Sequence, residues 1–141
     1  MTSEPLTSGR CLADFEGTWT LSRRIIHEDG PVAAFEGEAR WQPSGGGLDY
    51  SETGQLRMPG HAPINATRRY RWEEGLRVFF EDGRFFHAVP ARGGQAHHWC
   101  DPDDYRVTYD FADWPVFTTT WAVRGPRKAY RMISRYVRAD V

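Results

Sequence analysis

Two histidines, a cysteine and three aspartates lie within nine residues in the segment HHWCDPDDY, residues 97–105. Imidazole and thiolate groups are the usual ligands of zinc, and His87, His98 and Cys100 would supply three of them. No fourth ligand is evident, and the chain has no CxxC pair or other strong zinc spacing. We therefore predict that no metal or other cofactor is bound, and that these side chains line a wall as hydrogen-bonding groups.

The aspartates of the same segment surround a proline in the order Asp101-Pro102-Asp103-Asp104. Carboxylates so close together could bind calcium, but the full spacing of an EF-hand loop is missing. Aspartate side chains accept hydrogen bonds from nearby backbone amides, which makes this sequence typical of a turn. We expect a turn between two strands here.

A second candidate group consists of the charged residues Arg23, Glu52 and Arg68. Buried charges are costly unless they are paired, so these residues either bind one another or meet a ligand. Arginine favours planar, bidentate recognition of a carboxylate or phosphate. The remaining alternative is that one or more of them lies at an open rim, in water.

The elements that must position these side chains are short strands. Apolar residues recur with a period of two between Gly, Pro and Asp, and no window keeps helical spacing over several turns. Ten strands with short connections form an antiparallel meander, which avoids exposed edges by closing on itself. The predicted fold is all-β, a single up-and-down barrel of about ten strands. The predicted strands are residues 16–27, 32–43, 47–58, 63–73, 76–81, 84–90, 95–100, 104–112, 116–124 and 128–138.

The segment EDGR, residues 81–84, predicts which side chains face inward. Asp-Gly is typical of a two-residue hairpin turn, so Glu81 should pair with Arg84. Counting outward from this pair separates an apolar inner face from an outer face. The inner face holds Leu76, Val78, Phe80, Phe85, His87 and Val89, and the outer face holds Arg77, Phe79, Glu81, Arg84, Phe86 and Ala88.

A turn at Gly93-Gly94 carries the count into the next strand, where Cys100 should lie opposite His87. The turn at residues 101–104 then pairs Cys100 with Tyr105. A slip of one residue at the double glycine would reverse the faces. On this count His98, Cys100, Tyr105, Val107, Tyr109 and Phe111 point inward, and His97 and Trp99 point outward.

The same alternation assigns faces in the earlier strands. The inner residues there are Trp19, Leu21, Arg23 and Ile25, then Leu48, Tyr50, Glu52 and Gly54, then Arg68, Tyr70 and Trp72. The interior is therefore rich in polar groups. The predicted ligand-binding residues are Arg23, Glu52, Arg68, Tyr70, His87, His98, Cys100, Tyr105 and Tyr109.

Length and composition limit the classes of protein to consider. The 141 residues suit one domain, which we place at residues 11–141 after a loose tail over residues 1–10, with a helical turn from Cys11 to Phe15. The formal charge of −1 gives no long-range attraction to nucleic acid or anionic membranes. Two distant cysteines, no signal-peptide core and no membrane-spanning apolar run indicate a reduced, cytoplasmic protein.

Gly17-Thr18-Trp19 opens the first strand and resembles the Gly-x-Trp signature of lipocalin and calycin barrels. In those families the Trp closes the barrel base and an Arg near the last strand packs across its ring, which implies this part for Arg135 or Arg138 of SRYVR. FEDGRFFH, HHWCDPDDY and GPRKAY resemble a family of small bacterial proteins of unknown function with an expected lipocalin-like fold, over about residues 14–138. The resemblance implies a fold and a binding cavity, and it assigns no catalytic residue.

Two functions use this interior directly. The leading hypothesis is a protein that binds a small organic ligand, anionic or polar and aromatic, through its Arg, His and Tyr groups. The alternative is an enzyme in which His87 or His98 acts as general base and Tyr105 or Tyr109 as proton donor.

A third hypothesis is a filled barrel that acts through its outer surface. Aromatic side chains on the outer face would then form an apolar patch for a partner protein or a homodimer. The residues expected in that patch are Phe79, Phe86, Trp99 and Trp121.

Overall fold

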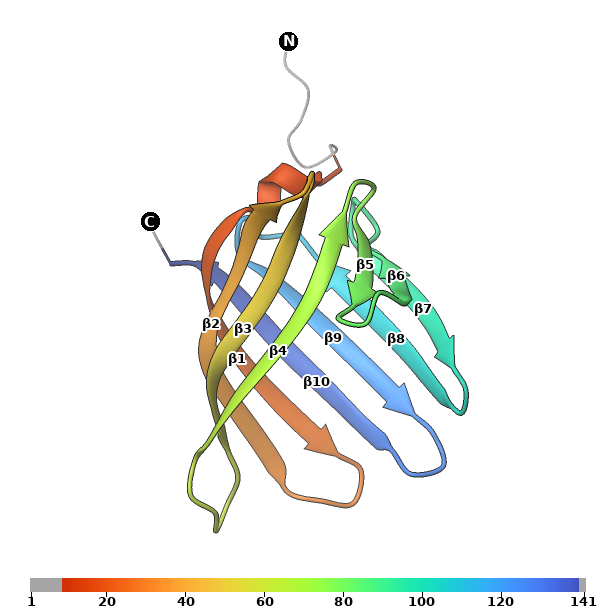
Figure 1. Cartoon of the computed structure of the whole chain (residues 1–141). Coiled ribbons are helices and arrows are strands. Elements are labelled where there is room, and N and C mark those ends of the chain that lie inside the picture. The colour runs from red at the N-terminus through yellow and green to blue at the C-terminus, as the bar shows by residue number, and fades with distance from the viewer. Residues whose placement is uncertain (1–8, 140–141) are drawn as a thin grey trace.

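The computed structural model describes residues 9–139 and shows a short 3-10 helix followed by ten antiparallel strands (Figure 1). Every predicted strand is present, with both ends within two residues of the expected bounds, and the predicted helical turn is the element η2. The elements are η2 (Leu12–Phe15), β1 (Gly17–His27), β2 (Val32–Ser44), β3 (Gly47–Arg57), β4 (Ile64–Glu73), β5 (Arg77–Phe80), β6 (Phe85–Ala88), β7 (Gly94–Cys100), β8 (Asp103–Asp110), β9 (Phe117–Arg124) and β10 (Ala129–Arg138).

Most of the predicted tail, residues 1–8, lies outside the described residues, as do residues 140 and 141. At Arg10 the chain is attached to the barrel. The backbone N–H of Arg10 donates to the carbonyl oxygen of Ala91 at 2.6 Å, and its guanidinium lies 4.7 Å from the ring centroid of Trp114.

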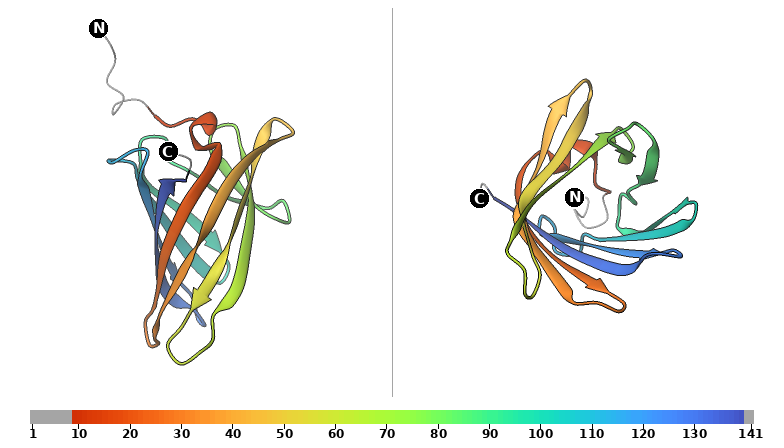
Figure 2. Two further views of the ribbon diagram at one scale, coloured as in Figure 1. Left: turned by 90° about the vertical axis from the view of Figure 1, so that its left-hand side faces the viewer. Right: turned by 60° about the horizontal axis from the view of Figure 1, so that its bottom comes forward.

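The strands form one sheet in the order β6-β5-β4-β3-β2-β1-β10-β9-β8-β7, which is the predicted up-and-down order. The first strand pairs with the last one, and the sheet curls into a nearly closed barrel (Figure 2). Within residues 9–139 no hydrogen-bonded ladder joins β6 to β7, so a seam remains between them. β5 and β6 have four residues each and pair with each other. On its other side β5 pairs with β4, over residues 70–73. The wall between β4 and β7 is therefore a short hairpin bonded on one side.

Two paired glycines allow β2 and β3 to bend together. Gly37 lies directly opposite Gly54. A Cβ on Gly37 would lie 2.1 Å from the carbonyl oxygen of Thr53, and a Cβ on Gly54 would lie 2.3 Å from that of Glu36. Because only glycine fits such an approach, this pair marks a tight bend of the barrel wall.

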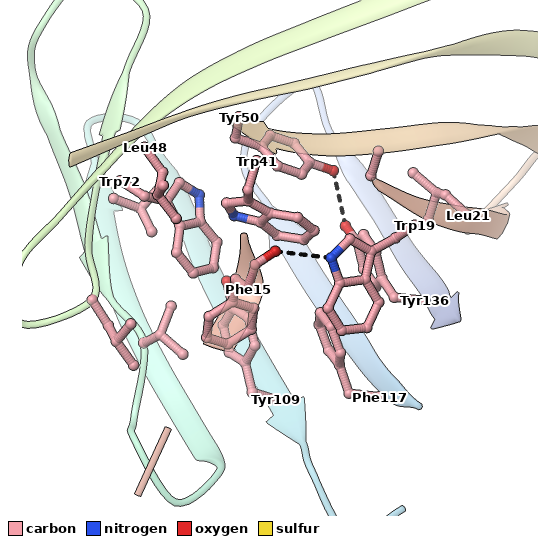
Figure 3. Packing of buried hydrophobic residues seen from close by; sticks show 14 of the residues in the cluster. Phe15, Trp19, Leu21, Trp41, Leu48, Tyr50, Trp72, Tyr109, Phe117 and Tyr136 are labelled. Carbon is pink, nitrogen blue, oxygen red and sulfur yellow. Dashed lines mark hydrogen bonds between the residues drawn. The ribbon is translucent and has the colours of Figure 1, made fainter. Parts of the chain in front are cut away.

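Aromatic rings fill the end of the barrel that η2 covers (Figures 1 and 3). Phe15 of η2 is fully buried, and the indole Nε1–H of Trp19 donates to its carbonyl oxygen at 2.9 Å. This end is a densely packed aromatic core, and the interior cavity reaches only its inner side, at Trp41, Trp72 and Phe117. The rings gathered there belong to Phe15, Trp19, Trp41, Trp72, Phe111, Trp114 and Phe117.

The predicted stacking of an arginine on Trp19 is confirmed for Arg138. Its guanidinium lies 4.3 Å from the Trp19 ring centroid and donates to the carbonyl oxygens of Glu16 and Asp14. Gly17 makes room for it, since a Cβ there would lie 2.8 Å from Nη1 of Arg138, and its φ of +125° also requires glycine. Arg135, the other candidate, is exposed and takes no part in this contact.

The register predicted for the β5–β6 hairpin is wrong by one residue at its tip. Phe79 pairs with Phe85 whereas Val78 pairs with His87, so Phe86 is an extra residue in a bulge. Phe86 is consequently buried and Phe85 is 49% exposed, the reverse of the prediction, while His87 faces inward as expected. The cause is the turn, because Asp82 does not adopt the positive φ that a two-residue Asp-Gly turn requires.

The faces of β7 and β8 are as predicted, although their pairing differs. Cys100 pairs with Asp103, two residues from the expected Tyr105, and a shift of two preserves the faces. β7 pairs with β8 and not with β6, so the expected opposition of His87 and Cys100 does not occur. Pro90 contributes to this result, because it lacks an N–H and begins the turn that closes at Gly93.

Candidate functional site in the barrel interior

A buried ion pair lies on the inner wall of the barrel and joins β1 to β3 over β2. The guanidinium of Arg23 binds the carboxylate of Glu52 through two hydrogen bonds, one of 3.0 Å from Nη2, and its Nε donates to Ser134 Oγ at 2.7 Å. Burial opposes the charge on Arg23, but the bonds and charge of Glu52 outweigh it and raise the pKa of Arg23 above its ordinary value. The sequence left open whether the interior charges pair with one another, meet a ligand or lie at the rim. Arg23 and Glu52 pair with each other.

Two tyrosines complete this network. The Tyr50 hydroxyl donates to Glu52 and lies 3.1 Å from the Tyr136 hydroxyl (Figure 3). Burial raises the pKa of Tyr50 well above its ordinary value and that of Tyr136 to about 12, so both hydroxyls stay neutral. The network satisfies itself without a ligand.

Arg68 is the interior charge that the network does not use. Its Nη1 lies 3.4 Å from the Tyr70 hydroxyl, its Nη2 lies 3.9 Å from the Met132 sulfur, and its guanidinium lies 5.6 Å from the Trp121 ring centroid. Among the described residues no carboxylate lies within ion-pair distance of Arg68. It is a half-buried cation surrounded by aromatic and apolar groups.

Aromatic side chains from six strands, β4 to β9, surround the Arg68 side of the interior, and we refer to them as the ring cluster. Phe86 lies at its centre, 5.3 Å from Trp121, 5.4 Å from His98 and 5.7 Å from Tyr105 between ring centroids. Phe86 is buried, whereas the other members are partly exposed, so the cluster reaches solvent. The ring cluster consists of Tyr70, Phe80, Phe86, His98, Tyr105 and Trp121.

The segment HHWCD divides between two environments as predicted. His98 points into the ring cluster, while His97 is exposed and binds Asp104, and Trp99 is 59% exposed. Cys100 shares the partly buried face of His98. Of the other outward aromatics predicted, Phe86 and Trp121 instead line the interior, so the expected outer patch of four rings does not form.

Lysine supplies a second cation at the rim of the ring cluster. Nζ of Lys128 lies 3.3 Å from the Tyr105 hydroxyl and 3.2 Å from a carboxylate oxygen of Asp103. Bonds to Tyr105 and Asp103 raise the pKa of Lys128, so it is charged at neutral pH. Unlike Arg68, this cation already has a carboxylate partner.

His87 and Tyr109 form a separate buried pair. Nε2 of His87 lies 2.9 Å from the Tyr109 hydroxyl. Burial, with a smaller contribution from the charge of His98, lowers the pKa of His87 to about 4, and burial raises the pKa of Tyr109 well above its ordinary value. Both side chains are neutral near pH 7.

The interior cavity is narrow. The space open to the centres of water molecules is about 30 Å³, whereas pockets for drug-sized ligands occupy roughly 300–1,000 Å³. It runs from Arg68 and the ring-cluster residues Tyr70 and Trp121 to Trp41 and His87 further in. Occupation by an organic ligand therefore requires side chains to move apart.

Neither a metal-binding group nor a membrane-spanning helix is found in the described part of the chain. Among residues 9–139 no three His, Cys, Asp or Glu side chains lie close enough to hold a metal ion. Within the same residues no helix has the length and apolar character needed to cross a membrane.

Sequence reasoning missed Trp41, Phe86 and Trp121 as interior residues of the candidate site. Trp121 could have been found from the alternation of Phe117, Thr119 and Trp121 along one strand, a period of two that places all three inside. Phe86 could not, because its orientation depends on a bulge that the residues around Asp82-Gly83 do not reveal.

The family model for a family of unknown function, DUF6314, matches residues 15–138 of this chain. The chain belongs to that family. No curated protein matches the sequence. Among solved structures, an S-type phycobiliprotein lyase, CPES, from Guillardia theta is similar with a TM-score of 0.66, covering 92% of this chain and 91% of that one at 7% identity. At this identity the likeness shows a shared barrel fold.

Proposed function

We propose that this DUF6314 member binds a small planar anion, aromatic or conjugated, at the ring cluster, with Arg68 as its counter-ion. The observation that carries the proposal is that Arg68 lies half-buried against Trp121 with no carboxylate partner among the described residues. A partly buried charge without a counter-ion is incompletely solvated, so a ligand that supplies the anion would stabilise this arrangement.

The surroundings of Arg68 suit a flat ligand. Aromatic rings bind planar molecules through stacked and edge-to-face contacts, and the ring cluster offers both faces and edges. His98 contributes a further polar group, and Lys128 adds positive charge at the rim. The sites predicted at Tyr70, His98 and Tyr105 thus belong to this proposal, whereas the pairing of Arg23 with Glu52 assigns those two residues a structural part.

Entry of the ligand requires the β5–β6 hairpin to move. This hairpin carries Phe80 and Phe86, whose rings are stacked 4.5 Å apart and fill the ring cluster. It pairs with β4 and has no ladder to β7 in the described chain, so its outer side can open without breaking sheet hydrogen bonds. Opening would widen the narrow cavity next to Arg68.

This geometry supports binding more than catalysis. A general base must lie within hydrogen-bond reach of a substrate-sized space, and the space beside His87 is about 30 Å³. His98 is nearer to solvent, but it has no tyrosine hydroxyl within hydrogen-bond distance among the described residues.

The test uses 8-anilinonaphthalene-1-sulfonate and 2-naphthoate as planar anionic probes. Arg68→Met should weaken binding of both by about tenfold or more, since a hydrogen bond to a charged group contributes roughly 1.5–3 kcal/mol. The matched control is Arg69→Met, which removes an exposed arginine from the outer face of the same strand. Equal affinities for the two variants, or no binding of either probe to the wild type, would refute the proposal. Native mass spectrometry of protein purified from cells would reveal a retained ligand directly.

A further inference from the structure

Two buried polar atoms beside the cavity have no hydrogen-bond partner within the described chain. They are the indole Nε1 of Trp41 and the imidazole Nδ1 of His87, in side chains that are 2% and 3% exposed. Leaving a buried donor or acceptor unsatisfied costs about 1–3 kcal/mol. Both residues line the same cavity as Arg68. The free-energy cost of each unsatisfied group therefore arises in the lining of that cavity.

The protonation of His87 follows from its partner. The Tyr109 hydroxyl is fully buried against Nε2 of His87 and has no other partner among residues 9–139. If that hydroxyl donates to Nε2, the neutral imidazole carries its proton on Nδ1, and only this N–H is left unsatisfied. If Nε2 donates instead, both the tyrosine proton and Nδ1 lack partners. The first arrangement leaves fewer buried groups unsatisfied and is therefore favoured.

Trp41 is also a donor, because an indole nitrogen can only donate. Figure 3 shows its ring enclosed by Tyr50, Trp72 and Phe15, with no hydrogen bond drawn to its nitrogen. Two residues that line one cavity thus each carry a buried N–H without an acceptor in the described chain. The cavity volume of about 30 Å³ fits one or two water molecules, given roughly 10–15 Å³ for each, and also fits a single projecting oxygen.

We propose that Trp41 and His87 form an acceptor-binding site at the inner end of the cavity, which takes a carbonyl oxygen of the bound ligand. This inference rests on the proposed function. A neutral oxygen fits better than an anionic one, because Arg23 is committed to Glu52 and no other cation borders this end. The ligand class is therefore a planar molecule with an anionic group for Arg68 and a carbonyl group on its rings.

The test compares two compounds that differ by one oxygen, 9-fluorenone-2-carboxylate and fluorene-2-carboxylate. The ketone should bind the wild-type protein about tenfold more tightly, the effect of satisfying buried donors. Trp41→Phe and His87→Phe should each reduce this preference toward unity. Arg68→Met should weaken both compounds equally and keep the preference.

A second measurement does not depend on how well the variants fold. In nitrogen-15 spectra of the wild-type protein, the Nε1–H signal of Trp41 should move downfield when the ketone is added and stay in place with fluorene-2-carboxylate. Equal affinities with an unmoved Trp41 signal would overturn this inference and leave the proposed function standing. A ketone preference that survives both variants would overturn the assignment of the donors. Binding of neither compound would count against both proposals.

Discussion

Glu52 lies directly opposite Arg68 across β3 and β4, yet its carboxylate binds Arg23, which comes from β1 on the far side of β2. The bridge is possible because the inner face of β2 carries small residues there, Gly37 and Ala39, between Arg23 and Glu52. The two arginines therefore differ in their partners. Arg23 is held by protein groups, and Arg68 has no carboxylate partner among the described residues.

Removal of Arg23 should destabilise the fold strongly. Arg23→Met leaves the Glu52 carboxylate buried without its cation, and breaking a buried pair in this way costs about 3–5 kcal/mol. Urea unfolding followed by tryptophan fluorescence measures the loss. Arg24→Met, at the exposed neighbouring position, is the control and should change stability by less than about 0.5 kcal/mol. A loss of similar size in both variants would mean that the ion pair has no special part.

Arg138 should hold η2 against the barrel end. Arg138→Met removes the contact with Trp19 and the two bonds to the carbonyl oxygens of Glu16 and Asp14, which together should lower stability by about 2–4 kcal/mol. Hydrogen exchange of the amides near η2 should accelerate in the same variant. Arg135→Met is the matched control, and it should leave both measurements unchanged because Arg135 is exposed.

The two histidines of HHWCD should differ in their effect on ligand binding. His98→Leu removes a polar group from the ring cluster and should weaken binding of 8-anilinonaphthalene-1-sulfonate by about threefold to tenfold, equivalent to one hydrogen bond. His97→Leu alters the outer face only and should leave the affinity unchanged. Circular dichroism should show both variants folded. If His97→Leu were the one that weakened binding, the placement of the site on the inner face would be wrong.

The strands and most faces could be predicted from the sequence because a barrel wall repeats one simple pattern. Alternating apolar residues identify a strand and its buried face together, and a slip in pairing by two residues, as between Cys100 and Asp103, leaves the faces intact. The Gly17, Trp19 and Arg138 contact was predictable for a different reason, since it accompanies a recognisable short motif.

The candidate site was less predictable because it depends on where the pattern is interrupted. A bulge places both Phe86 and His87 inside, and the missing ladder between β6 and β7 separates His87 from Cys100. Glu52 binds Arg23 and not Arg68 because β2, the strand between Arg23 and Glu52, carries small residues there. This relationship involves three strands, and counting residues from one hairpin to the next does not reveal it.

The stability of the protein should fall as the pH is lowered from about 6.5 to 4, and His87 should account for a distinct part of the fall. Burial lowers the pKa of His87 to about 4 in the folded state, against 6.5 as the ordinary value. Between these values the unfolded chain binds a proton that the folded protein does not, so acid favours unfolding. The effect is small at about pH 6.5, vanishes about one unit higher, and reaches about 3 kcal/mol near pH 4, at about 1.4 kcal/mol for each pKa unit.

The measurement that isolates this effect is urea unfolding of the wild type and of His87→Phe across the same pH range. Carboxylates titrate in both proteins, so their contribution is common and the difference between the two curves reports His87. The wild type should lose about 3 kcal/mol more than the variant between about pH 7 and pH 4. Parallel curves would show that His87 protonates as readily in the folded protein as in the unfolded chain. The imidazole would then be in contact with water, and its Nδ1–H would not be the unsatisfied donor on which the acceptor-binding site depends.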